Sequence, residues 1–244
     1  MNPYRIEVRG LTKWFGRKQV LREVELSVAP GRIAAIVGPN AAGKTTLLKC
    51  LLGMVRPAEA SVLRLDGIPM NGDPGYRSRI GYMPQAARFP EQLTGRELLD
   101  FLVDLRGLPA ERDEELLASF GLERFLDKPI RTLSGGTRQK LNAVAAFLFR
   151  PALLILDEPT AGLDPVAAGI LKEKVLRAAS RGASVLLTSH VMSEIEELAQ
   201  DLVFLVEGRV VFAGTVAELL ERSGEARLER AIARRLLESG SPAA

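Results

Sequence analysis

Residues 38–46 constrain this chain more than any other stretch of its sequence. They read Gly-Pro-Asn-Ala-Ala-Gly-Lys-Thr-Thr and fit G-x-x-x-x-G-K-[ST], the pattern of a loop whose backbone N–H groups surround a phosphate. The apolar run 33–37 before them predicts a buried strand, and residues 45–52 after them predict a helix. A strand, a glycine turn and a helix together aim backbone donors and the positive end of a helix dipole at one anion. The stretch therefore predicts a phosphate-binding loop.

The side chains of this loop indicate a nucleotide with Mg²⁺. Lys44 is expected to reach the β- and γ-phosphates, and the Thr45 hydroxyl is expected to help hold the metal ion. The other loop positions expected to bind the nucleotide are Gly38, Pro39, Asn40, Ala41, Ala42, Gly43 and Thr46. The alternative, a glycine-rich turn that binds nothing, is disfavoured by the flanking strand and helix patterns.

Composition limits the classes of protein to be considered. The chain has 244 residues, 47% of them apolar, which is ample for the core of one large domain or two small ones. Its formal net charge is only +3 and no long basic stripe interleaved with aromatic residues appears, so nucleic acid is not expected as a partner. No apolar run approaches the roughly 18 residues of a membrane span. The chain itself is therefore not expected to cross a membrane.

Strand and helix patterns alternate along the chain, except in one block that lacks strand signals. Strands are expected at residues 5–11, 20–28, 33–37, 61–67, 80–85, 153–156, 184–188, 202–206 and 209–213. Helices are expected at residues 45–52, 94–106, 111–120, 136–149, 166–181 and 193–200. The continuously apolar strands predict a parallel sheet that is covered on both faces.

Three further segments have distinct patterns. Residues 14–18 are expected to form a turn between the first two strands. Thr94 and Glu97 form a capping-box pattern at the start of a helix. The tail from residue 216 onward is helix-like with mixed arginine and glutamate, and is expected to be a solvated helical appendage.

Two carboxylates follow the apolar strand at 153–156. They are Asp157 and Glu158, at the carboxyl end of a strand, the edge where an open α/β sheet binds its ligand. Asp157 suits Mg²⁺ coordination, and Glu158 is then placed to polarise an attacking water molecule. The alternative is that both acids cap the next turn, but the phosphate loop elsewhere in the chain favours the catalytic interpretation.

Residues 133–139 are the most diagnostic stretch. Ser134 can cap the helix that follows, and Gly135 and Gly136 leave its first N–H groups bare, which makes a second anion site. A chain that binds one nucleotide has little use for a second phosphate site unless that site serves the nucleotide of another subunit.

With these motifs in this order, residues 5–215 resemble the ATP-binding subunit of ABC transporters, whose signature begins Leu-Ser-Gly-Gly. The resemblance implies an α/β fold: a RecA-like P-loop NTPase core with an N-terminal antiparallel β portion and a helical subdomain insert. It implies one ABC ATPase domain over residues 1–244. Residues 1–87 and 151–215 would be its core, 88–150 the helical subdomain with the signature, and 216–244 a C-terminal helical tail.

The same resemblance implies cofactors, partners and a location. It implies ATP with Mg²⁺, hydrolysed between two ATPase subunits arranged head to tail, for which a homodimer is expected. It implies integral membrane permease subunits that the ATPase drives, and a cytoplasmic chain, peripheral on the inner face of the cell membrane. The cargo, its direction and a heterodimer as the alternative stay open.

The resemblance also implies roles for single residues. Phe15 stands where the family stacks an aromatic ring on adenine, with a loop anchor as the alternative. Gln85 stands at the Q-loop glutamine, which senses Mg²⁺ and the attacking water, and His190, the only histidine, at the switch histidine that contacts the γ-phosphate. Ser134 and Gly136 would contact the γ-phosphate bound to the opposite subunit. Residues 161–164 match the D-loop at the dimer interface.

Two positions depart from the family pattern. Ala41 occupies a place often held by glycine, so its Cβ requires a permitted backbone angle. Thr137 replaces the usual signature glutamine, and activity is expected to survive because Ser134 and the glycines supply the phosphate contacts. Residues 133–143 also resemble the ATPase subunits of copper-processing systems that mature nitrous oxide reductase.

Two other classes of function compete with a transporter subunit. One is a soluble ABC ATPase acting on a macromolecular complex, such as a ribosome or DNA, but the tandem cassette or long coiled coil typical of those proteins is missing. The other is a nucleotide-dependent regulatory module without turnover, which Glu158 and His190 disfavour. Residues 86–93, with the apolar Phe89 and Leu93, lie where the family docks a cytoplasmic helix of the membrane subunit. The alternative is a core contact.

Overall fold

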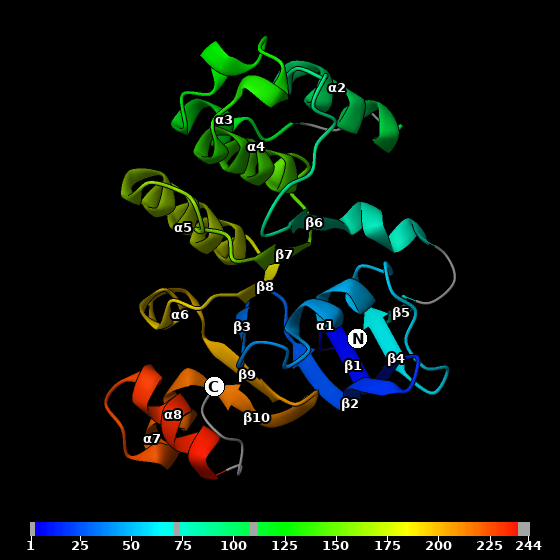
Figure 1. Ribbon diagram of the computed structural model, residues 1–244, viewed down its shortest axis with the longest axis vertical. Coiled ribbons are helices and arrows are strands. Elements are labelled where there is room, and N and C mark those ends of the chain that lie inside the picture. The colour runs from blue at the N-terminus through cyan, green and yellow to red at the C-terminus, as the bar shows by residue number, and fades with distance from the viewer. Residues whose placement is uncertain (1–2, 71–73, 108–111, 239–244) are drawn as a thin grey trace.

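The computed structural model describes residues 3–70, 74–107 and 112–238, and Figure 1 shows its elements. The strands are β1 (Ile6–Phe15), β2 (Lys18–Val28), β3 (Ile33–Val37), β4 (Val62–Leu65), β5 (Ile68–Pro69), β6 (Ile80–Met83), β7 (Leu153–Asp157), β8 (Ser184–Thr188), β9 (Asp201–Val206) and β10 (Arg209–Thr215). The α-helices are α1 (Lys44–Leu51), α2 (Gly95–Arg106), α3 (Glu115–Ser119), α4 (Gly135–Phe147), α5 (Pro165–Ser180), α6 (Met192–Leu198), α7 (Val216–Ser223) and α8 (Leu228–Glu238). Short 3-10 helices are η1 (Pro74–Arg79), η2 (Glu123–Phe125) and η3 (Ile130–Thr132).

A six-stranded sheet forms the centre of the molecule, in the order β10-β9-β3-β8-β7-β6. Strands β9, β3, β8, β7 and β6 are parallel, and β10 is antiparallel to β9. Every residue of β3 is buried, because alternate side chains enter two different cores: Ile33 and Val37 one, Ile36 the other. The predicted parallel sheet, covered on both faces, is confirmed.

The second sheet is antiparallel, with the order β2-β1-β4-β5. Helix α1 packs with it and with one face of the parallel sheet in a single apolar cluster that includes Leu47, Leu51 and Cys50. Burial raises the pKa of the Cys50 thiol to about 11, so this cysteine behaves as a small buried apolar side chain.

Helices α2, α3 and α4 form a separate group, drawn in green in Figure 1, that the chain inserts between β6 and β7. The capping box at the start of α2 is confirmed: Glu97 N–H donates to Thr94 Oγ1 at 3.2 Å, and Thr94 N–H donates to Glu97 Oε2 at 2.7 Å. The helix expected at 111–120 is shorter, since α3 begins at Glu115. The expected start at residue 111 lies outside the described residues.

The first hairpin is longer than its hydrophobic pattern predicts. Strand β1 continues through Trp14 and Phe15, which pair with Gln19 and Lys18, so the turn is only two residues long. The turn predicted over 14–18 is therefore present but confined to residues 16–17, and the prediction made it too long. Backbone pairing extended the strand past the point where alternation of buried and exposed residues stops, and the sequence pattern reports only the alternation.

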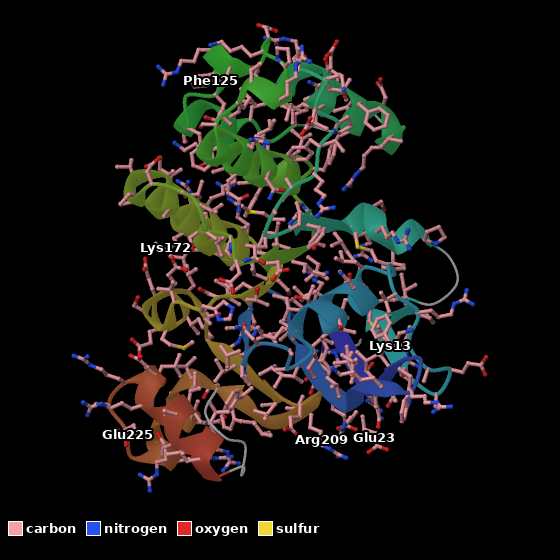
Figure 2. All side chains as sticks on the ribbon, viewed as in Figure 1. Lys13, Glu23, Phe125, Lys172, Arg209 and Glu225 are labelled. Carbon is pink, nitrogen blue, oxygen red and sulfur yellow. The ribbon has the colours of Figure 1, made fainter. Side chains whose placement is uncertain are left out.

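The C-terminal segment is not a solvated appendage, which corrects the expectation. Leu219 on α7 is 2% exposed, Leu228 and Ala231 on α8 are fully buried, and Ile232 joins them in the main core cluster. The buried residues of α8 are spaced so that they form a narrow apolar stripe along the helix. The composition of the segment does not indicate this stripe, because arginine and glutamate dominate the rest of the helix. Glu225, labelled in Figure 2, marks the connection between the two helices.

This packing predicts that α8 contributes to stability. Leu228→Ala should lower the free energy of unfolding by about 2–5 kcal/mol, because it removes a fully buried side chain and leaves a cavity. Chemical denaturation measures the change. Leu237→Ala on the same helix is the matched control, since Leu237 is 73% exposed and its loss should cost less than about 0.5 kcal/mol. Equal stability of the two variants would contradict the packing.

Candidate functional site

The carboxyl ends of β3, β8 and β7 meet at one edge of the parallel sheet, because these strands are adjacent and parallel. A cavity of about 580 Å³ opens there. It is lined by Lys18, Gln19, Val20, Arg22, Asn40, Ala41, Ala42, Gly43, Lys44, Thr45, Thr46, Gln85, Asp157, Glu158, His190 and Glu207. The structure thus brings together side chains from six separate segments of the sequence.

The loop between β3 and α1 has the backbone that its glycines predict. Gly38 has φ 154°, and a Cβ there would lie 2.1 Å from Leu205 O, so only glycine fits. Gly43 has φ 107° and precedes the first helical residue. Ala41 also has a positive φ, 62°, which a Cβ tolerates at a cost of about 1–2 kcal/mol. The departure from glycine at this position is thus accommodated with local strain.

Lys44 lies half-buried at the start of α1. Its Nζ donates to Gly38 O at 2.6 Å and to Pro39 O at 3.1 Å. Burial lowers the pKa of Lys44, while the charges of Glu158 and Asp157 oppose that shift. The cavity therefore combines a partly desolvated cation with two carboxylates, which is suited to a ligand made of an anion and a divalent cation.

Thr188, the last residue of β8, holds the carboxylate of Asp157 and the backbone of Glu158. Its Oγ1 donates to Asp157 Oδ1 at 2.6 Å and accepts from Glu158 N–H at 3.1 Å, and its carbonyl oxygen also accepts from Glu158 N–H at 3.1 Å. Glu158 itself has φ 50°, a left-handed conformation that is rare for this residue type. The sequence pattern predicts Thr188 only as the end of a strand. Its position beside a Ser-His pair is the signal that could have pointed to it.

His190 and Glu158 contact each other across the cavity. His190 Nε2 lies 3.2 Å from Glu158 Oε1, and the backbone N–H of His190 donates to Glu158 Oε2 at 3.2 Å. The His190 side chain is 55% exposed while that of Glu158 is 12% exposed. The imidazole therefore stands toward solvent and the carboxylate beneath it.

The first hairpin supplies a wall of the cavity that the sequence did not predict. Lys18 and Arg22 line it, whereas Phe15 does not. Phe15 pairs with Lys18 across the hairpin, and its ring, 51% exposed, lies 4.9 Å from Lys13 Nζ. Figure 2 labels Lys13 on this hairpin. Phe15 is therefore the strand partner of a lining residue, Lys18, but is not itself part of the lining.

The signature segment lies at the start of α4 and does not line the cavity. Ser134 caps the helix, accepting from Thr137 N–H at 3.2 Å, and its Oγ lies 2.8 Å from Thr137 Oγ1. A Cβ on Gly136 would lie 3.3 Å from Gly162 O, whereas one on Gly135 would meet nothing within 4 Å. Lys140 Nζ contacts Asp164 Oδ2 at 2.9 Å, so the signature and residues 161–164 lie side by side.

The three residues expected to hold Mg²⁺ all line the same cavity: Thr45, Gln85 and Asp157. They offer a hydroxyl, an amide carbonyl and a carboxylate, the hard oxygen donors that Mg²⁺ prefers. Asp157 has only one of its oxygens engaged by Thr188 in the described hydrogen bonds, which leaves the other for a cation. The residues therefore fit the ion.

Comparison with known proteins defines the class. The sequence matches the ABC transporter family over residues 21–161. It is 36% identical over 224 residues to the ABC-type transporter ATP-binding protein EcsA of Bacillus subtilis (strain 168), covering 90% of each chain. It is also 36% identical to the daunorubicin resistance ATP-binding protein DrrA3 of Streptomyces coeruleorubidus, over 92% of this chain and 72% of that protein.

A solved structure of an ATP-binding subunit of an ABC transporter gives a TM-score of 0.89 at 32% identity, covering 94% of this chain and 98% of that one. The chain belongs to the ABC transporter family, and it is an ATP-binding subunit of that family. The P-loop NTPase fold and the assignment as an ATPase coupled to transport are confirmed. Among the described residues, no helix has the length and apolar character required to span a bilayer.

The contacts of Thr188 generate a prediction. Thr188→Val keeps the side-chain volume but leaves the buried Asp157 without its donor, so it should lower the free energy of unfolding by about 1–3 kcal/mol. Thr188→Ser, which keeps the hydroxyl, is the matched control and should lose less. Denaturant unfolding of both variants makes the comparison. A valine variant as stable as the serine variant would show that the hydroxyl is dispensable.

Proposed function

We propose that this chain hydrolyses ATP as one half of a head-to-tail dimer and drives separate integral membrane permease subunits. The observation that carries the proposal is the cavity that collects Lys44, Glu158 and His190 at one edge of the sheet. Membership of the ABC transporter family supports coupling to a permease. ATP with Mg²⁺ occupies this cavity in the working protein.

The proposed roles follow from the atoms that face the cavity. Lys44 donates to the β- and γ-phosphates, and His190 donates to the γ-phosphate. Glu158 accepts a proton from the attacking water, since its carboxylate is oriented by two contacts with His190. Thr45, Gln85 and Asp157 hold Mg²⁺, which when bound neutralises charge on the phosphate oxygens. Phe15, the strand partner of the lining residue Lys18, stacks on the adenine ring.

The second subunit supplies the remaining phosphate contacts. Ser134 caps a 13-residue helix that begins with Gly135 and Gly136, and none of the three lines the cavity of its own chain. The start of this helix can bind an anion only from outside the chain, which supports a partner copy placed head to tail. We expect that copy to be identical, giving a homodimer.

The division of the chain and its location are part of the same proposal. Residues 1–87 and 151–215 act as the ATPase core, 88–150 as the helical subdomain and 216–244 as a C-terminal helical tail that packs on the core. The subunit is cytoplasmic and peripheral on the inner membrane face, where its permease holds it. A role in copper processing for nitrous oxide reductase maturation rests on residues 133–143 alone.

A groove of about 560 Å³ is the proposed permease site. It lies between β6 and helices α2 and α4, and includes Phe89, Leu105 and Phe149. Phe89 is half-buried and packs against the main core cluster, so it is both a core contact and a lining residue. Leu105 is 67% exposed. It is therefore the better residue with which to test docking without disturbing the fold.

The catalytic proposal predicts the behaviour of Glu158→Gln. This variant keeps the shape and hydrogen bonding of Glu158 but loses the proton acceptor, so turnover should fall about 10²–10⁴-fold. ATP binding should survive, and an ATP-bound dimer should accumulate. Phosphate release and size-exclusion chromatography with ATP measure the two outcomes.

A double variant tests formation of the dimer separately from the loss of turnover in Glu158→Gln. Ser134→Arg added to Glu158→Gln should spare ATP binding but prevent the dimer, because the bulky cation blocks the signature surface. Wild-type turnover by Glu158→Gln would overturn the role of Glu158 as the base. A dimer that still forms with Ser134→Arg would count against the head-to-tail arrangement.

The groove generates the next prediction. Leu105→Asp should leave ATP binding and the melting temperature unchanged but weaken assembly with the permease, because a charge would be buried there without a partner. Co-purification from membranes measures assembly. Ile68→Asp, on the exposed strand β5 and 55% exposed in the wild type, is the matched control and should assemble normally. Full assembly of the Leu105 variant would exclude this groove.

A further inference from the structure

One short loop separates the two cavities described above. Pro84 lines the groove between β6, α2 and α4, and Gln85, the next residue, lines the nucleotide cavity. The loop follows the last residue of β6, Met83, which is fully buried. A displacement of Pro84 by even part of an ångström would therefore be passed along one peptide bond to Gln85.

A single buried side chain ties this loop to helix α4. Asn142 is 2% exposed, and its Nδ2 donates to Pro84 O at 2.8 Å. The same amide donates to Gln139 Oε1, one turn earlier on the helix, at 3.3 Å. Since proline has no N–H, its carbonyl is the backbone group through which Pro84 can be held by a hydrogen bond.

Burying the two amide side chains of Asn142 and Gln139 costs free energy that a purely structural role would not require. Asn142 and Gln139 stand on a helix whose other buried residues are mainly apolar, and Gln139 Nε2 is buried with no partner among the described residues. Apolar side chains of similar volume would fill the space without leaving a donor unsatisfied. The arrangement therefore favours a role for the Asn142 donor that packing alone does not explain.

Asn142 also reaches the groove, since it lines that cavity together with Ala145 of α4 and with Phe149, which follows the helix. One residue of α4, Asn142, thus both lines the groove and holds the loop before Gln85. Because buried hydrogen bonds have narrow geometric tolerance, a shift of α4 would move Pro84 with it.

We propose that Asn142 is a positioning residue, which holds the loop at Pro84 to α4 and so sets where the Gln85 side chain stands in the nucleotide cavity. Its hydrogen bond makes the position of Gln85 depend on the position of the helical subdomain. This inference rests on the proposed function, in which Gln85 takes part in hydrolysis and the groove binds the permease.

The test combines kinetics with a probe of the loop. Asn142→Leu retains the volume and removes the donor, so kcat should fall about 10- to 100-fold through misplacement of Gln85, while ATP affinity should stay unchanged. Fluorescence of Trp14, the only tryptophan, reports ATP binding because it adjoins Phe15. Cys50 is the only cysteine and is buried, so a nitroxide on Ala86→Cys can report the mobility of the loop.

In the Asn142→Leu background the nitroxide spectrum should become more mobile, whereas a merely structural residue would change only the melting temperature. If the leucine variant does not fold, Asn142→Ala is measured in the same way. A folded variant with wild-type kcat and an unchanged nitroxide spectrum would overturn the proposal. The mobility measurement needs no turnover, so the two failures can be told apart: an inactive wild-type chain would overturn the proposed function, whereas an unchanged nitroxide spectrum would overturn the tie between Asn142 and the loop.

Discussion

The parallel pairing of β3 with β8 and of β8 with β7 is the constraint on which the candidate site depends. The register places Thr188 beside Ile36 on one side and beside Asp157 on the other. Because side chains alternate between the two faces of a strand, a slip of one residue in β7 would turn Asp157 away from the Thr188 hydroxyl. The ladder of backbone hydrogen bonds thus sets the position of both carboxylates relative to the loop after β3.

Strain at the site accompanies this arrangement. Glu158 and Ala41, which both line the cavity, have positive φ in the left-handed region. Such conformations cost of order 1–3 kcal/mol each and persist where the surrounding structure fixes them. Glu158 is fixed by two hydrogen bonds from its N–H to Thr188, and Ala41 by the loop between two required glycines. The core clusters on both faces of the sheet supply the stability that tolerates them.

The sequence predicted the features that depend on local pattern. The loop at 38–46, the acids after β7 and the capping box at Thr94 each follow from residues close in the chain, and the structure has the strands and helices on which they stand. The missed features depend on pairing between distant segments. The hydroxyl of Thr188 matters only because β8 adjoins β7, and α8 is buried only because the core has a face for Leu228. Composition could show neither the role of the Thr188 hydroxyl nor the burial of α8.

The central position of β3 has a consequence for synthesis of the protein. Ile33 pairs with Val185, and Ala34 pairs with Leu186 and Asp201, so both neighbours of this strand are made much later than the strand itself. At the ribosome's pace of about 5–20 residues per second, β3 waits roughly 10–30 s for them. During that interval an apolar strand and its glycine loop have no sheet to join. The nascent chain therefore exposes a hydrophobic segment to chaperones, and the cavity at the sheet edge can assemble only after His190 and Glu207 have been made.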